Sequence, residues 1–516
     1  MDITLISVDN DVAHHGLRSI SSLLKSHGHN VKLIFLTTGN EMTDGNILSS
    51  ALYPESVINQ VKELTKDSDI VGVTSMALTA ERAKEIFSHL KGKILLWGGA
   101  YPTMNPDICI QDVDYVFRGE SEFALLEFVQ CIEQGKDLSG IKNLWLRKNG
   151  VVIRNELRPL NNDLDALPIP DYNMKDHYVL IEGHIVNMKE EYFFEKYKEN
   201  LLLVYTQRGC PYTCSFCSNH TFNELYDGKF RIVRKKSIRY VINELLEIKK
   251  HLPSMNKIWF TDDCFLMRSR EDLILFNELY KKHINLPFRC YGIAKHIIED
   301  KLGLLVDAGL KEILVGVQSG SRRTLQYYNR PIFKEDILKA SKVINKFKDK
   351  LMPRYELIYS NPYEEKDDLL ETIDLARKLP EPFRLDAYNL VFFPGIALYN
   401  KAKEEGVIKN EEDAGYDSDY FNANYHIRKR TNVYLNNLIF WISGIHTRWK
   451  SGKIPKPLLK LLVKDSTISF FERYRKFPLF LTYVYTLPGN VKLRIYNSFS
   501  MKNKVRLKNL LRVAYA

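Results

Sequence analysis

Gln207-Arg-Gly-Cys210-Pro-Tyr-Thr-Cys214-Ser-Phe-Cys217 is the stretch of this 516-residue chain that decides its fold class. Its cysteines follow a Cys-x3-Cys-x2-Cys spacing directly after the apolar, strand-like run 201–205. So short a loop can direct three thiolates toward one site, and thiolates select iron-sulfur clusters, zinc or Cu(I) over hard cations. A cluster held by three protein ligands keeps one iron open for an outside molecule, whereas a structural zinc site needs a fourth protein ligand.

Zinc is the alternative that the spacing leaves open. His220 lies three positions beyond Cys217 and could complete a Cys3His site, so the spacing alone favours neither metal. A disulfide is less favoured because the seven cysteines are an odd number and no N-terminal signal peptide is apparent. These features predict a reduced, cytoplasmic protein.

Strand-like and helix-like segments alternate regularly from residue 201 to residue 393. The apolar runs are short, are bounded by turns and are separated by helical patterns. This arrangement is typical of βαβ units and a parallel sheet. The expected strands are 201–205, 257–261, 287–291, 312–317, 354–359 and 386–393, and the expected helices lie within 232–251 and at 270–283, 295–308, 335–347 and 366–378. Six strands predict a partial (β/α)6 barrel, in which the chemistry collects at the C-terminal ends of the strands.

This region resembles the radical S-adenosylmethionine (SAM) enzymes at several points in their order along the chain. In that family a Cys-x3-Cys-x2-Cys loop, usually with an aromatic residue before its last cysteine, binds a 4Fe-4S cluster whose open iron chelates SAM. The resemblance implies that Cys210, Cys214 and Cys217 are the cluster ligands. It also implies that Phe216 packs near the adenine of SAM, although an ordinary loop-anchoring aromatic would explain Phe216 by itself.

Motifs at later strand ends extend this resemblance. Asp262 and Asp263 match an acidic segment that lies beside SAM or the substrate, whereas without the family they would read as a helix N-cap. Gln318 and Ser319 lie in Gly-Val-Gln-Ser-Gly-Ser, where the family usually has glutamate in place of Gln318, near the ribose and carboxylate of SAM. An amide accepts one hydrogen bond and adds a donor but carries no charge. The turn 359–365 departs from the family's Gly-rich pattern, and 393–406 matches again.

The first part of the chain predicts a separate, doubly wound α/β module. Strands are expected at 2–8, 31–36, 70–74 and 93–97, with helices at 16–27, 58–64 and 81–90. In such Rossmann-like sheets a ligand binds in the crevice beyond the C-terminal strand ends. The expected boundaries are 1–150 for this module, 151–200 for a linker, 201–406 for the barrel and 407–516 for a basic, mainly helical C-terminal region.

The module resembles the cobalamin-binding domain found ahead of radical SAM cores in carbon methyltransferases and in anaerobic magnesium-protoporphyrin ester cyclases. The resemblance rests on Trp-Gly-Gly-x-x-Pro-Thr at 97–103 and on Arg-Gly-Glu-Ser-Glu at 118–122. It implies that cobalamin lies against Ser75, Gly98, Gly99, Tyr101, Pro102 and Thr103, because glycines let the backbone approach a bulky ligand closely. Without the second module, ordinary tight turns would explain these glycines.

One departure concerns the histidine that coordinates cobalt in some cobalamin domains, in the motif Asp-x-His-x-x-Gly. This chain has Asp11, His14, His15 and Gly16 in the corresponding loop, but with a different register. Either cobalamin binds here without a protein histidine, which we favour, or the domain has lost the cofactor.

Charge is concentrated at the C-terminus. Residues 425–516 hold 19 Lys/Arg and two acidic residues, a net of +17, whereas the whole chain carries +11. Basic residues interleaved with Trp, Tyr and Phe suit an anionic membrane surface or a polyanionic partner. A helical cap whose lysines face water explains the pattern equally well, and nucleic-acid binding has no recognisable fold or motif behind it.

The sequence therefore predicts a cytoplasmic, oxygen-sensitive, cobalamin-dependent radical SAM enzyme. If the basic C-terminal region contacts lipid, the enzyme would bind peripherally at the inner membrane surface. The resemblance implies methylation of an unactivated carbon of a small-molecule or lipid-like substrate, with methylcobalamin as methyl donor and a flavodoxin or ferredoxin as electron donor. A cyclase or rearrangement enzyme without methyl transfer, and a non-catalytic zinc-binding scaffold, are the alternatives. The sequence assigns no catalytic side chain.

Overall fold

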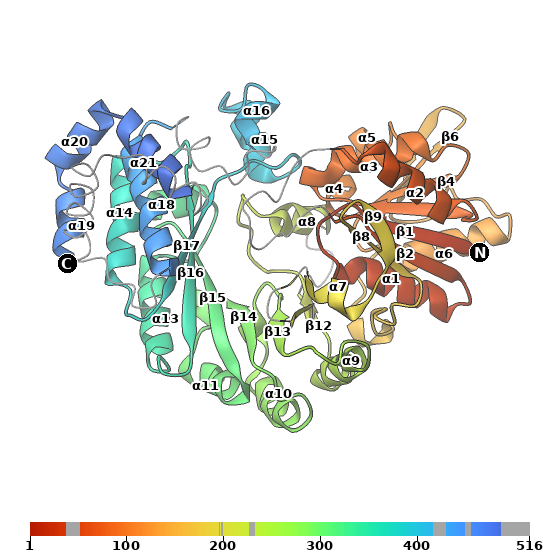
Figure 1. The fold of residues 1–516 in the computed structure, drawn as a ribbon, viewed down its shortest axis with the longest axis horizontal. Helices are drawn as coiled ribbons and strands as arrows, with labels where there is room; N and C mark the ends of the chain where they lie inside the picture. The colour runs from red at the N-terminus through yellow and green to blue at the C-terminus, as the bar shows by residue number, and fades with distance from the viewer. Residues whose placement is uncertain are drawn as a thin grey trace.

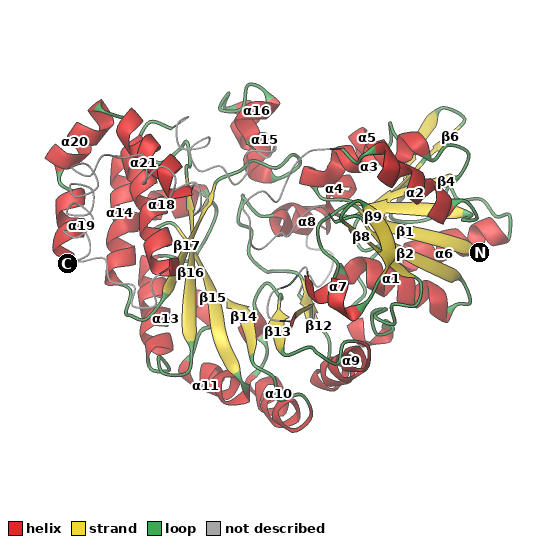
Figure 2. Cartoon of the chain, in the orientation of Figure 1, coloured by secondary structure: helices red, strands yellow, loops and turns green. Residues whose placement is uncertain are grey.

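The structure is a computed structural model that describes residues 1–37, 52–195, 197, 200–226, 233–415, 430–448 and 456–486. It consists of two α/β modules and a helical C-terminal region (Figure 1). Each module is built on one sheet, and helices cover both sheets (Figure 2). None of the helices in these ranges has the length and apolar character that a membrane span requires.

The N-terminal sheet has nine strands. Their order is β7 (Val151–Arg154), β6 (Leu144–Lys148), β5 (Tyr115–Phe117), β4 (Ile94–Gly98), β3 (Ile70–Thr74), β1 (Asp2–Ser7), β2 (Asn30–Phe35), β8 (His177–Ile181) and β9 (His184–Asn187). In the middle of the sheet, from β5 to β8 in this order, each strand pairs parallel with its neighbour. At the edges, β6, β7 and β9 pair antiparallel with their neighbours. Part of the segment expected as a linker, 151–200, thus supplies β7, β8 and β9.

Helices lie on both faces of this sheet, as the doubly wound fold requires. They are α1 (His15–Ser26), α2 (Glu55–Thr65), α3 (Ala80–His89), α4 (Ala100–Met104), α5 (Pro106–Cys109) and α6 (Glu122–Glu133), with α7 (Glu190–Glu195) leading to the second module. Apolar residues of α1 and α6 pack with one face of the sheet, and those of α2 and α3 pack with the other. The alternation of the strands sends Leu5 to the first face and Ile6 to the second.

The second sheet confirms the six-stranded partial barrel. Its order is β10 (Leu201–Val204), β13 (Lys257–Phe260), β14 (Phe288–Gly292), β15 (Leu310–Gln318), β16 (Met352–Tyr359) and β17 (Arg384–Asn389), and every neighbouring pair is parallel. A separate two-stranded ribbon joins β11 (Gln207–Arg208) to β12 (Arg234–Lys235). The C-terminal strand ends therefore point to one edge, where the cysteine loop follows β10.

The barrel helices are α8 (Ser218–Tyr226), α9 (Ile238–His251), α10 (Arg270–His283), α11 (Glu299–Ala308), α12 (Arg322–Tyr327), α13 (Lys334–Asn345), α14 (Lys366–Lys378), α15 (Ala397–Glu404) and α16 (Glu411–Ala414). Local chemistry sets their ends. Ser269 caps α10 by accepting a hydrogen bond from the N–H of Asp272, and Lys281, Lys282 and His283 occupy its last turn. On the outer face of the sheet, Phe260, Phe276, Tyr280 and Phe288 form one buried aromatic cluster.

The described part of the C-terminal region is helical, as expected. It contains α18 (Val433–Arg448), α19 (Lys456–Leu462), α20 (Asp465–Arg473) and α21 (Lys476–Thr486). Helix α18 packs on β17 and α14, and α20 and α21 pack on α18. These helices extend the barrel at the end farthest from the N-terminal module (Figure 1). Residues 416–429, 449–455 and 487–516 of the expected basic region lie outside the described residues.

Candidate active site

A cavity of about 520 Å³ lies between the two modules, where the C-terminal ends of their strands face each other. Both modules contribute apolar and polar groups to its walls. The residues that line it include Leu5, Gly72, Thr74, Leu96, Gly98, Gly99 and Thr103 from the first module and Tyr205, Arg208, Gly209, Ser218, Asn219 and Asp263 from the second. Both modules therefore build one site, at the position where parallel α/β sheets bind ligands.

The cysteine loop is held in place by main-chain hydrogen bonds on both sides. The N–H of Ser215 donates to the carbonyl of Tyr328 at 2.8 Å, and the carbonyl of Ser215 accepts from the N–H of Leu398 at 2.9 Å. Within the loop, the N–H of Cys217 donates to the carbonyl of Cys214 at 3.0 Å. The loop is thus fixed by residues that follow later strands of the barrel. These contacts hold the three cysteines of the loop in a defined arrangement.

The thiols of this loop are free and buried or half-buried. Burial raises the pKa of Cys210 to about 12 and also raises the pKa of Cys217. These thiols therefore stay protonated near neutral pH until a metal displaces the protons. Nη1 of Arg330 lies 3.6 Å from Cys214 Sγ, so a fixed cation faces the sulfur that would carry the negative charge of the bound state.

The loop fits an iron-sulfur cluster better than a zinc ion. Within the described ranges, no three His, Cys, Asp or Glu side chains converge closely enough to hold one metal ion. A 4Fe-4S cluster instead takes each cysteine at a different corner, so its ligands need not converge on one point. Nε2 of His220, the other candidate zinc ligand, lies 3.3 Å from a carboxylate oxygen of Glu224.

Phe216, expected near the adenine of SAM, packs edge-on against Tyr328, with 5.0 Å between the ring centroids. It belongs to a small apolar cluster with Leu398 and Phe392. The contact with adenine stays a prediction.

The two aspartates after β13 have different surroundings. The N–H groups of Thr206 and Gln207 donate to Oδ1 of the fully buried Asp262 at 2.5 and 2.9 Å, and the Thr206 hydroxyl donates to its Oδ2. Asp262 thereby ties the start of the cysteine loop to β13. Asp263 instead lines the cavity, where it accepts a hydrogen bond of 2.7 Å from Asn219. Of the two carboxylates, Asp263 is the one that the cavity exposes to a ligand.

The motif after β15 bends sharply. Gln318 has φ 68°, in the left-handed region that a non-glycine residue seldom adopts, and the strand register shifts between Gly316 and Gln318. Ser319 is buried and donates to Glu364 at 3.0 Å. Burial raises the pKa of Glu364 to about 8, so this carboxyl holds its proton near neutral pH. Its hydrogen bond with Ser319 stabilises the turn. The expected contacts of Gln318 and Ser319 with SAM stay predictions.

On the N-terminal side, Gly98, Gly99 and Thr103 line the cavity, as expected of cobalamin contacts. Gly99 has φ 107°, and a Cβ built on it would lie 2.5 Å from Thr74 Oγ1. A side chain at this position would clash with Thr74 and Ser75, so the glycine lets the turn pack closely against them and thereby sets the shape of this wall. The hydroxyl of Thr103 fixes this wall by donating to the Gly99 carbonyl at 2.7 Å and accepting from the N–H of Gly119 at 3.0 Å.

The remaining expected cobalamin contacts lie behind this wall. Ser75 is fully buried, and its hydroxyl accepts a hydrogen bond of 2.9 Å from the indole N–H of Trp97. Tyr101 packs against the same tryptophan, with 5.9 Å between the ring centroids, and Pro102 is buried. These residues support the shape of the wall, and their direct contact with cobalamin stays a prediction.

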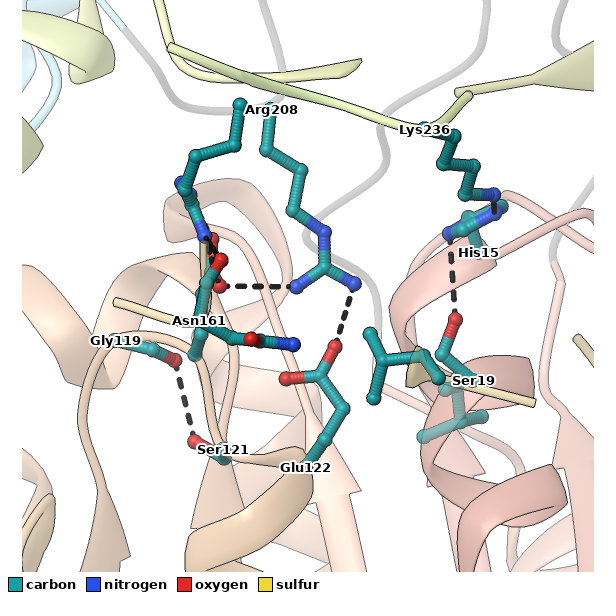
Figure 3. Close-up of polar contacts among 12 residues, drawn as sticks. His15, Ser19, Gly119, Ser121, Glu122, Asn161, Arg208 and Lys236 are labelled. Carbon is teal, nitrogen blue, oxygen red and sulfur yellow. Dashed lines mark hydrogen bonds and ion pairs between the residues drawn. The ribbon is translucent and has the colours of Figure 1, made fainter. Parts of the chain in front are cut away.

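Both histidines of the loop before α1 face the cavity, yet neither has a free ring nitrogen. In His14, Nδ1 accepts from the N–H of Leu17 and Nε2 lies 3.5 Å from Asp9. In His15, Nδ1 contacts Ser19 at 3.4 Å and Nε2 lies 3.3 Å from Lys236 (Figure 3). The same Nε2 lies 3.3 Å from Glu244. Burial, together with the charge of Lys236, lowers the pKa of His15 to about 4, so this ring is neutral near pH 7. The engaged nitrogens support binding of cobalamin without a protein histidine.

An ion-pair network joins the modules beside the cysteine loop. Arg208, two residues before Cys210, points toward the N-terminal module and donates to Glu122 at 2.6 Å (Figure 3). Its other terminal nitrogen lies 3.1 Å from Glu120, which also accepts two hydrogen bonds from Arg234, at 2.5 and 2.8 Å. Although burial lowers the pKa of Arg208, the charges of Glu122 and Glu120 outweigh burial and raise it above its usual value. The cluster loop is therefore anchored electrostatically to the wall of the cavity opposite it.

Sequence reasoning missed three parts of this site. It quoted Glu120 and Glu122 within a family motif, but their partner Arg208 lies 86 residues beyond Glu122. It also missed Arg330 and Glu356, whose side chains lie near the mouth of the barrel. The carboxylate of Glu356 forms no hydrogen bond or ion pair with the described residues, and burial together with the charge of Asp386 raises its pKa to about 7.

Comparison with known proteins matches each module separately. Residues 204–376 match the model of the radical SAM superfamily, and residues 1–129 match the model of the B12 binding domain. An uncharacterised methyltransferase of Pyrococcus horikoshii is 26% identical over 70% of this chain and 73% of its own length. The bacteriochlorophyllide d C-8(2)-methyltransferase of Chlorobaculum tepidum is 25% identical over 72% and 78%. The anaerobic magnesium-protoporphyrin IX monomethyl ester cyclase of Rubrivivax gelatinosus is 25% identical over 62% and 56%.

Solved structures share the arrangement of both modules. OxsB, a cobalamin-dependent SAM radical enzyme, aligns with 99% of this chain and 75% of its own, with a TM-score of 0.61 and 18% identity. The radical SAM methyltransferase TsrM of Kitasatospora setae aligns with 79% of this chain and 76% of its own, with a TM-score of 0.61 and 15% identity. At these identities the likeness concerns the fold. Together with the two family matches, it identifies this chain as a B12-binding radical SAM enzyme, a family whose cofactors are a 4Fe-4S cluster, SAM and cobalamin.

Proposed function

We propose that this chain is a cobalamin-dependent radical SAM methyltransferase that acts on an unactivated carbon. The observation that carries the proposal is the single cavity lined by both modules. It brings the glycine wall of the N-terminal module to face the residues that surround the cysteine loop. A substrate enclosed there would be within reach of both modules, which a reaction using a radical and a methyl donor requires.

The chain's own residues divide the work of holding and orienting. Cys210, Cys214 and Cys217 would hold the cluster, and Gly98 and Gly99 would receive the cobalamin ring. When bound together with SAM, these groups would supply a 5'-deoxyadenosyl radical, formed from SAM with one electron from the cluster, and a methyl donor. The walls of the cavity would shield bound groups from part of the bulk water, which would limit side reactions of a radical.

Relatives of this chain support methyl transfer and also define its rival. Two of the compared relatives are named as methyltransferases, and a third is named as an anaerobic cyclase. A cyclase or rearrangement enzyme would use the same radical without delivering a methyl group to product.

Isotope labelling separates these two functions without knowledge of the substrate. The anaerobically reconstituted enzyme receives cobalamin, a low-potential reductant and SAM that carries a deuterated methyl group, and mass spectrometry follows the label and 5'-deoxyadenosine. We expect the label on cobalamin and, with cell extract as a source of substrate, on a small-molecule or lipid-like product. Release of 5'-deoxyadenosine with no transfer of the label to cobalamin or product would establish the cyclase or rearrangement class instead.

A further inference from the structure

The C-terminal helices expose an unusual number of large apolar side chains. Those of α19, the α20 region and α21 are 38% to 56% exposed and consist of Leu461, Phe470, Tyr474, Phe477, Phe480 and Leu481. Six of the fourteen large hydrophobic residues that are exposed in the described structure thus lie within 21 consecutive positions. Apolar side chains exposed singly need no explanation, but a concentrated group marks an interaction surface.

Ring contacts and helical spacing join the aromatic members into one feature, which we call the aromatic ridge (Phe470, Tyr474, Phe477 and Phe480). Phe470 and Tyr474, four positions apart across the end of α20, have ring centroids 4.9 Å apart. Phe470 also contacts Phe471, whose ring stacks with Phe477 at 6.0 Å. Phe480 lies three positions beyond Phe477 on α21, so it continues the same surface.

Cations border the ridge, and they outnumber the acids among them. Lys460, Lys464, Arg473, Arg475 and Lys476 are all exposed. The carboxylate of Asp465 pairs with Lys366 at 2.5 Å, and Glu472 accepts a hydrogen bond of 2.8 Å from the N–H of Tyr434 and lies 3.7 Å from Arg475. Among the described residues, no acidic side chain forms an ion pair with Lys460, Lys464 or Lys476. The surface around the rings is therefore strongly positive.

The sequence that follows adds to this charge. Residues 487–516 contain seven Lys/Arg and no acidic residue. Phe and Tyr rings combined with Lys and Arg match the interface of a lipid bilayer, where rings settle at headgroup depth and cations meet lipid phosphates.

We propose that the aromatic ridge and its basic border dock this enzyme on an anionic lipid bilayer. A soluble polyanion such as a nucleic acid would use the cations but would leave most of the apolar area exposed, so the combination favours a membrane. The ridge lies at the end of the molecule opposite the N-terminal module (Figure 1), so docking leaves the cavity between the modules uncovered. This inference does not depend on which reaction the cavity supports.

Vesicle sedimentation with the full-length, cofactor-loaded protein tests the proposal. Phosphatidylcholine vesicles with phosphatidylglycerol should bind the protein, and vesicles of phosphatidylcholine alone should bind it far more weakly. The combined change Lys464→Gln, Arg473→Gln and Lys476→Gln should weaken binding to anionic vesicles on the order of 100-fold, because each of the three cations contributes about a factor of five near such a surface. Rising ionic strength should also weaken the binding of the wild-type protein to anionic vesicles.

An aromatic variant and a charge-matched control complete the design. The combined change Phe470→Ser, Phe477→Ser and Phe480→Ser should weaken vesicle binding about 10-fold or more. The combined change Lys91→Gln, Lys136→Gln and Lys142→Gln removes three exposed cations from the N-terminal module and should leave vesicle binding unchanged. Circular dichroism and vesicle-free release of 5'-deoxyadenosine should match wild type in every variant, which separates lost docking from lost folding.

Three results would overturn the proposal. The first is that wild type does not sediment with anionic vesicles. This includes the case in which it binds only a soluble polyanion such as heparin. The second is that both ridge variants bind the vesicles as well as wild type does. The third is that light scattering shows a dimer that the aromatic changes dissociate, because the ridge would then be a subunit interface.

Discussion

Replacing Arg208 with Gln should weaken the contact between the modules measurably. The change removes the cation that pairs with Glu122 at 2.6 Å, where the side chains are 20% and 8% exposed. Glu120 keeps its two hydrogen bonds from Arg234, so Glu122 is the carboxylate that loses its partner. The loss of one partner from a buried pair costs roughly 3–5 kcal/mol. Because Arg208 is partly exposed and Gln can still donate one hydrogen bond, we expect about 2–3 kcal/mol here.

Arg270→Gln provides the matched control for this prediction. Arg270 pairs with Asp300 at 3.1 Å, but both side chains are more than half exposed, at 56% and 52%. Removal of such a surface pair costs about 0–1 kcal/mol. Urea titration followed by circular dichroism measures the unfolding free energy of wild type and both variants. The reasoning about Arg208 is refuted if the first unfolding transition of Arg208→Gln falls at the same urea concentration as that of Arg270→Gln.

Three further changes probe other parts of the site. Gly99→Ala should weaken cobalamin binding about 10-fold or more, since the new Cβ would lie 2.5 Å from Thr74 Oγ1 and would distort this wall. Gly92→Ala is the control, because Gly92 also has a positive φ, 85° against 107° at Gly99, but has open space around it. An absorbance titration that finds equal affinities for the two variants would contradict the assignment of this wall. Cys214→Ala should abolish the release of 5'-deoxyadenosine and lower the iron and sulfide content, while one equivalent of zinc and no iron in wild type would exclude the cluster. Glu356 has a pKa raised to about 7, so the folded state binds its proton more tightly than the unfolded state and loses stability as the pH rises from 4.5 to 7. The unfolding free energy of Glu356→Gln relative to wild type should therefore increase across this pH window and stay constant above it. A difference that does not change with pH would show that Glu356 is not buried as described.

Elements whose signals are local were predictable from the sequence. The helix 270–283 has a serine cap before it and cations in its last turn, and the structure places α10 at the same residues. The strand 70–74 is a short apolar run bounded by polar residues, and β3 has the same bounds. The three cysteines were identified as a site for the same reason, because their spacing lies within one loop.

Features that depend on tertiary contacts were not predictable. Strands β8 and β9 come from a polar and aromatic segment without periodicity, and they form because β2 offers an edge for β8 to pair with. The ion pair of Arg208 with Glu122 joins residues far apart in the sequence. The left-handed backbone of Gln318 has no signal in its residue type, since the bulge in β15 imposes it.

The central claim is that the cluster and cobalamin lie close together, at the cavity between the two modules, and electron paramagnetic resonance tests it most directly. The protein is loaded with cobalamin, its cobalt is brought to the paramagnetic Co(II) state, and the cluster is reduced. If the two groups share the cavity, the relaxation of the Co(II) signal should be faster in wild type than in Cys214→Ala, which lacks one expected cluster ligand. Identical relaxation of the Co(II) signal in the two proteins, with the cluster present and reduced in wild type, would contradict the account.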